Sequence, residues 1–252
     1  MPIVKKTLQE MNLLDDFLFG KMVTYPGIGE RFCKHLVSAV LGVELTHIKI
    51  VPQKVYYGAN VDMHGARLDI YIEESESDVN GTVFDFEPDK NDKGHLKKAL
   101  PQRVRFYHAM IDHECLKSGK DYATLKRVIV ILMMPYDPFG YDHIVYTIKN
   151  HCEEVPDMPY DDGAKTIFLF MKGQKGHPTR KLQELLRYME ESTKENVCNE
   201  MLEDIHEMVT KVRCDKEVTI EYMKIFEREK MIYDDGKEEG LAEGRAEGIR
   251  NM

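Results

Sequence analysis

Apolar residues recur at helical spacing near the start of the chain. Between residues 11 and 41 they stand three and four positions apart, and only the turn signal Tyr25-Pro26-Gly27 interrupts them. This pattern predicts two helices joined by a tight turn.

Short runs rich in β-branched and aromatic residues follow, and such runs are typical of strands. The predicted strands lie at residues 48–57, 67–73, 82–87, 127–134, 143–149 and 165–170. A loop ending in Asn80-Gly81, a pair common in hairpin turns, separates the second and third strands. Residues 96–116 show helical spacing and predict a helix between the third and fourth strands.

The last third of the chain has a different pattern. Residues 178–233 are highly charged and show helical spacing, with breaks near Glu195 and Asp215. The order helix, strands, helix, strand predicts an α/β or α+β fold in which helices pack on a sheet. We expect a main domain over residues 1–175, a charged helical region over 176–235 and a tail over 236–252.

Glycine recurs every fourth residue in that tail, at positions 236, 240, 244 and 248. In a helix these glycines would form one stripe that allows close approach by a partner, such as a second copy of the chain. Glycine also weakens an exposed helix by about 1 kcal/mol per residue, which favours a frayed tail instead. The sequence leaves both alternatives open.

Composition limits the classes of protein. The 252 residues are 42% apolar, enough for a core, and the net charge of −9 excludes a surface that is basic throughout. The five cysteines form no CxxC pair, which indicates a reducing, cytoplasmic environment without a disulfide framework or zinc site. The sequence contains no apolar leader and no run of about 18 apolar residues, so we expect no membrane partner.

Carboxylates interrupt the second and third predicted strands. Side chains alternate faces along a strand, so Asp69 lies on the polar face of its strand, and Asp85 and Glu87 share one face of the next. If the two strands pair in a hairpin, Asp69 and Glu87 lie on the same face of the sheet, and Asp89 follows in phase. Such carboxylates can bind a hard divalent cation, or they can simply face solvent on an exposed hairpin.

Positive charge is concentrated directly after these carboxylates. Residues 93–127 contain nine lysines and arginines and three carboxylates, a net charge of +6 in an acidic protein. Cations interleaved with aromatic residues are typical of phosphate-binding surfaces. The alternative is a solvated helix face. The candidate DNA-binding side chains in this segment are Lys97, Lys98, Arg103, Arg105 and Tyr107.

The order of these elements resembles a known family. Asp69, the Glu87-Pro88-Asp89 segment, the helix with Arg103, Arg105 and Tyr107, the Gly119-Lys120-Asp121-Tyr122 turn and the following apolar strand are similar to the recombination-promoting nuclease or transposase-like branch of the PD-(D/E)xK nuclease superfamily. The segment Asp16-Phe17-Leu18-Phe19 and the glycine-rich tail are similar as well, so the resemblance spans about residues 10–250.

The resemblance implies a restriction-endonuclease-like fold, with a mixed central sheet flanked by helices. It also implies a hydrolase that cleaves DNA phosphodiester bonds with Mg²⁺, or with Mn²⁺ in its place, in recombination or mobile-element biology. Asp69 matches the metal-binding aspartate and Glu87 matches the glutamate of the (D/E)xK element. Arg103 and Arg105 would hold flanking phosphates, Gln102 or Lys90 would orient the attacking water, and Asp16 would add a carboxylate.

The third position of the family motif departs from the pattern. Asp89 stands where the superfamily has lysine and this branch often has glutamine, and Lys90 follows one place later. Asp89 would then serve as a further metal ligand. The departure equally favours a module of the same fold that binds DNA or assembles with protein without cleaving. An RNA-directed nuclease is a third hypothesis, which the sequence does not separate from a DNA-directed one.

Overall fold

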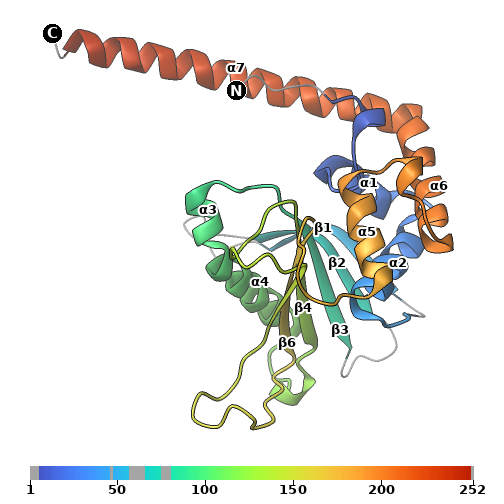
Figure 1. Cartoon of the computed structure of the whole chain (residues 1–252). Helices are drawn as coiled ribbons and strands as arrows, with labels where there is room; N and C mark the ends of the chain where they lie inside the picture. Colours follow the sequence, from blue (N-terminus) through green and yellow to red (C-terminus); the bar gives the residue numbers. More distant parts are fainter. Residues whose placement is uncertain (1–5, 46–47, 57–65, 75–80, 251–252) are drawn as a thin grey trace.

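A computed structural model describes residues 6–45, 48–56, 66–74 and 81–250. For residues 52–56, 66–70, 74, 229, 242 and 244–250 it describes the backbone alone. The described chain forms a six-stranded sheet with helices on both faces (Figure 1). This confirms the predicted class of mixed α and β structure.

The sheet is mixed, with strand order β1-β2-β3-β4-β6-β5. The first three strands form an antiparallel meander, β3, β4 and β6 are parallel, and β5 pairs antiparallel with β6. All six predicted strands are confirmed. They are β1 (Ile48–Tyr56), β2 (Ala66–Glu74), β3 (Thr82–Pro88), β4 (Arg127–Met134), β5 (Val145–Ile148) and β6 (Ala164–Phe170).

The helices also match the apolar pattern, with one difference. The predicted helix over 96–116 is divided at Ala99 into a short helix and a long one, and Pro101 occupies the first turn of the long helix, where a missing N–H costs nothing. The α-helices are α1 (Asp16–Thr24), α2 (Gly29–Leu41), α3 (Gly94–Lys98), α4 (Leu100–Cys115), α5 (Arg180–Glu190), α6 (Glu200–Cys214) and α7 (Lys216–Arg250).

Two separate cores cover the two faces of the sheet. Phe84 and Phe86 of β3 point into the larger core, which α1, α2, α5 and α6 complete. Val83 points the other way, into the smaller core beneath α4. The C-terminal helices α5 and α6 therefore share one core with the N-terminal helices (Figure 1), and the segment predicted as a separate region packs against the start of the chain.

Helix α7 begins on the body and then projects from it (Figure 1). Val218 is buried, and the Tyr222 ring lies 5.0 Å from the Phe17 ring. Further along, Met231 and Ile232 are exposed. The helix runs without a break across the predicted boundary at residue 236 and is helical to Arg250, which differs from the frayed alternative.

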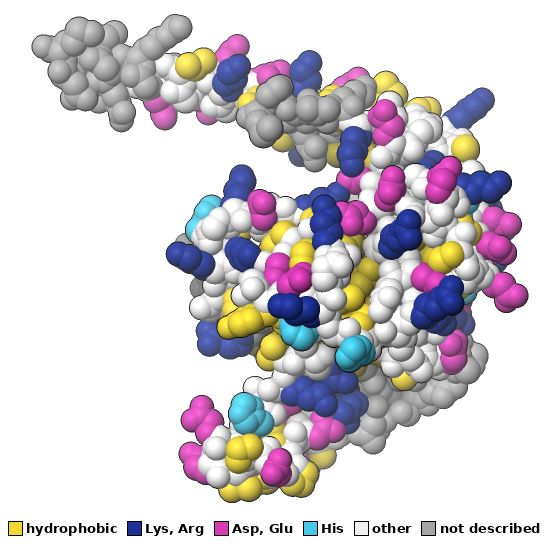
Figure 2. Space-filling view, viewed as in Figure 1, with side chains coloured by type: hydrophobic (Ala, Val, Ile, Leu, Met, Phe, Trp, Pro, Cys, Tyr) yellow, Lys and Arg dark blue, Asp and Glu magenta, His cyan; other side chains and the backbone are white. Residues whose placement is uncertain are grey.

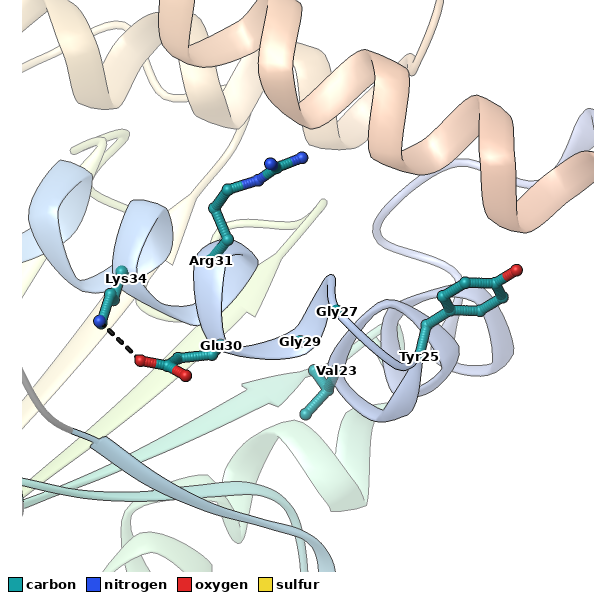
Figure 3. Close-up of a pocket in the computed structure, with 7 residues that line it drawn as sticks. All are labelled: Val23, Tyr25, Gly27, Gly29, Glu30, Arg31 and Lys34. Atoms are coloured by element: carbon teal, nitrogen blue, oxygen red, sulfur yellow. Dashed lines mark ion pairs between the residues drawn. The ribbon is translucent and has the colours of Figure 1, made fainter.

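The tight turn between α1 and α2 depends on a glycine. Gly29 is buried against the carbonyl group of Val23, and a Cβ added there would lie 2.9 Å from that carbonyl carbon and closer still to its oxygen (Figure 3). Backbone atoms cannot yield as a flexible side chain can. The hollow of about 430 Å³ at this corner is otherwise lined mainly by side chains of α2, among them the Glu30–Lys34 ion pair at 2.7 Å.

We expect Gly29→Ala to lower the free energy of unfolding by about 2 kcal/mol or more, because the added methyl group separates α1 from α2. Urea unfolding followed by circular dichroism measures this change. Gly236→Ala in α7 is the matched control, since its added Cβ meets no atom within 4 Å, and its effect should stay within about 1 kcal/mol. Equal effects of the two substitutions would contradict this account of the turn.

Candidate functional site

The carboxylates of β3 are buried. Asp85 is 0% exposed, Glu87 6% and Asp89 4%, because all three side chains lie on the face of the sheet that α4 covers. The interpretation of this strand as the wet face of an exposed hairpin is therefore wrong. Carboxylates are rarely buried unless they are paired, hydrogen-bonded or bound to a cation. Asp85, Glu87 and Asp89, called the carboxylate row below, therefore mark a candidate site.

The register of β2 and β3 brings Asp69 to this row. Ile70 pairs with Phe86 and Tyr71 with Asp85, so one further step along the antiparallel ladder puts Asp69 opposite Glu87. Tyr71 lies in the core beneath α4, and alternation assigns position 69 to the same face. The structure describes the backbone of Asp69 but not its side chain.

Asp89 is held by an arginine from α4. Its backbone N–H donates to the Met133 carbonyl oxygen at 2.9 Å, and its carboxylate accepts a hydrogen bond from the Asn91 N–H at 2.7 Å and another from the Arg103 guanidinium. Burial lowers the pKa of Arg103, but the hydrogen bond and charge of Asp89 outweigh it and raise the pKa overall. The residue at the third motif position thus has a basic partner 14 positions along the chain.

Tyr136 and Lys97 complete this side of the site. Tyr136 follows β4, and burial together with the nearby charge of Asp89 raises the pKa of its phenol. The Lys97 ammonium lies 5.7 Å from the centre of the Tyr136 ring, a cation–π contact. Lys97 therefore lies beside a tyrosine that neighbours Asp89, and its role in binding phosphate stays a prediction. Tyr136 was not identified from the sequence.

Lys90 turns toward α1. Strand β3 ends at Pro88, and the Lys90 ammonium forms an ion pair with Asp15 at the start of α1. Burial raises the pKa of the neighbouring Asp16, and the charge of Lys90 opposes that rise. Asp15, the residue before α1, and Asp16, its first residue, therefore bring two carboxylates near Lys90, and a role for Asp16 in the site stays a prediction. Asp15 was missed, although an acidic pair before an apolar helical run is a typical helix start.

The other predicted site residues lie further from the carboxylates or face elsewhere. Gln102 is exposed, and its amide nitrogen folds back to 3.2 Å from the Ala99 carbonyl oxygen. Lys98 is also exposed, and the Tyr107 ring stacks near Arg103, 5.9 Å from its guanidinium carbon.

Arg103 and Arg105 do not form one clamp. Residues two apart on a helix are separated by about 200° around its axis. Arg103 points to Asp89, whereas Arg105 is exposed and lines a groove on the other side of α4.

The basic segment at 93–127 is partly neutralised. Three of its nine cations form ion pairs with acids from elsewhere in the chain: Arg103 with Asp89, Lys126 with Glu73 and Arg127 with Asp161. Over the face shown in Figure 2, lysine and arginine side chains are interspersed with acidic ones. The predicted concentration of positive charge is therefore weaker in space than along the sequence.

A divalent cation suits the donor types of this row, because Asp69, Glu87 and Asp89 supply carboxylate oxygens, which Mg²⁺ prefers. Among the side chains that the structure describes, no group of three or more metal-ligand residues is arranged to hold an ion. The predicted metal ligands include Asp69, and the structure does not describe the side chain of that residue.

Comparisons with family models, with curated proteins and with solved structures found no match to this chain. Within the described residues, no helix has the length and apolar character needed to cross a membrane.

Proposed function

We propose that this protein is a metal-dependent phosphodiesterase of restriction-endonuclease-like fold that hydrolyses nucleic acid, with DNA as the substrate that the family resemblance implies. The observation that carries the proposal is the burial of Glu87 beneath α4, opposite Asp69 in the ladder. A strand that only formed a solvated hairpin face would leave this side chain in water.

The carboxylates have distinct roles in this proposal. Asp69 and Glu87 would hold Mg²⁺, or Mn²⁺ in its place, and the bound ion would supply Lewis-acid polarisation of a phosphate oxygen and a more acidic water. Arg103 fixes Asp89 and brings a positive charge to the row, where it can attract a phosphate oxygen. Lys90, held by Asp15, contributes a second cation at the end of β3.

The test is cleavage of supercoiled plasmid DNA by the purified protein with Mg²⁺, with Mn²⁺ and with EDTA. We expect relaxed and then linear DNA with either metal, and unchanged plasmid with EDTA. A matched pair of DNA and RNA single strands identifies the preferred sugar. An unchanged plasmid with both metals contradicts the proposal for DNA, and unchanged RNA as well would contradict it entirely.

A second candidate function is a module of the same fold that binds DNA or assembles with protein without cleaving it. The favouring observation is that the third motif position holds an aspartate already bound by Arg103 and the Asn91 N–H. A gel shift that persists in EDTA, combined with absent cleavage and with binding that tolerates Asp69→Ala, would support this function over the first.

A further inference from the structure

A groove of about 580 Å³ lies along the other side of α4, between that helix and the β5–β6 edge of the sheet. Pro101 and Val104, which lie within two positions of Arg103 in the sequence, line one end of it, and Asp112 lines the other end. Its volume is within the range of small-ligand sites, and every residue that lines it is described.

Three polar side chains on one face of α4 line this groove: Arg105, His108 and Asp112, spaced as i, i+3 and i+7. Among the described residues, Arg105 forms no ion pair, and Asp112 forms no side-chain hydrogen bond. The His108 Nε2 lies 3.0 Å from the Thr166 hydroxyl, while its Nδ1 is enclosed and has no hydrogen-bond partner in that part of the chain. The enclosed Nδ1 does not open into the groove, so the side chains of this row that remain for a ligand are those of Arg105 and Asp112.

The opposite wall is mixed, with an apolar patch among charged side chains that include Lys149, Asp162 and Lys165. Phe139 and Phe168 contact each other edge to face with ring centres 5.0 Å apart, and Ile148 stands 50% exposed beside them. The apolar patch faces the cation of Arg105 and the carboxylate of Asp112 on α4. This arrangement suits a ligand with a flat apolar face, an anionic end and an edge of N–H donors.

We infer that the α4 groove binds one nucleotide, with its phosphate at Arg105, the edge of its base at Asp112, and the face of its base against the apolar patch. Arg105 and Asp112 are seven positions apart, about 10 Å along the helix, so the two ends of a nucleotide meet different side chains. Carboxylates accept hydrogen bonds from the amino groups of bases.

This inference rests on the proposed function and specifies its substrate as single-stranded nucleic acid. A base that is stacked and paired in a duplex cannot enter a groove beside a helix, whereas an unpaired base can be splayed out and bound there. The groove would hold a nucleotide that flanks the scissile phosphate at the carboxylate row.

The experiment measures binding of the four deoxynucleoside monophosphates to the full chain by isothermal titration in EDTA, so that cleavage plays no part. We expect saturable binding in the millimolar range or tighter. Ala109→Trp, at an exposed position lining the groove, should fill it and weaken binding at least about tenfold. Glu114→Trp is the matched control, exposed on α4 outside the groove, and should bind as the original chain does.

A second variant tests the orientation. Arg105→Glu should weaken binding of the monophosphates and leave the corresponding nucleosides unaffected, because only the former carry the phosphate. Absent monophosphate binding, or binding that Ala109→Trp leaves unchanged, overturns the inference. If plasmid is cleaved but monophosphates do not bind, only the groove assignment fails; if they bind and no nucleic acid is cleaved, only the proposed hydrolysis fails.

Discussion

Replacing Glu87 by glutamine should reduce metal-dependent plasmid nicking by at least about 100-fold, because the amide keeps the shape of the side chain but loses the charge that holds a divalent cation. The residue is 6% exposed and follows the Ile70–Phe86 pair of the ladder, where one further step reaches Asp69. Initial nicking rates at saturating Mg²⁺ measure the effect. Raising the metal concentration should recover little of the activity.

Glu114→Gln is the matched control, because it makes the same chemical change at an exposed position of α4. It should change the initial nicking rate by less than about twofold, since a surface charge far from the carboxylate row is screened by salt. Circular dichroism and thermal unfolding of both variants separate lost chemistry from lost structure. Full nicking by a folded Glu87→Gln protein would contradict the assignment of this carboxylate to the metal.

Replacing Arg103 by methionine should lower the free energy of unfolding by about 2–3 kcal/mol, because it leaves the carboxylate of Asp89 buried without its basic partner. Asp89 is 4% exposed, and the Asn91 N–H and the nearby Tyr136 phenol remain beside its carboxylate, but neither carries a positive charge. Urea unfolding at neutral pH measures the loss.

Two further variants make this prediction specific. Arg105→Met changes an exposed arginine two positions away and should shift the free energy of unfolding by no more than about 0.5 kcal/mol. Adding Asp89→Asn to Arg103→Met removes the buried charge and should restore part of the lost stability. A double variant as unstable as the sum of its single variants would show that the two side chains do not act as a pair.

Local patterns in the sequence were sufficient to predict where the helices and strands of the fold lie. The run at 127–134 predicts β4 with its observed ends, and the turn at Tyr25-Pro26-Gly27 separates α1 from α2. Alternation also predicted that Asp85 and Glu87 share a face, because strand geometry assigns successive side chains to opposite faces whatever the strand packs against. The ladder of β2 and β3 then follows from a short hairpin connection.

Burial of the carboxylate row could not be read from the same pattern. An alternating strand looks the same whether its polar face meets water or a helix. The coverage depends on α4 crossing back over the sheet between the parallel strands β3 and β4, and that packing also created the groove beside Arg105, which no motif in the sequence marks.

The sequence by itself determined the helices, the strands and the face on which each strand carboxylate lies, since these depend on neighbours a few residues away. Only the tertiary structure decided that Asp89 pairs with Arg103, that Lys90 pairs with Asp15 and that Arg105 lines a groove against the β5–β6 edge. Charged side chains choose partners by distance in space and by the burial they share, and both are set when elements far apart in the chain pack together.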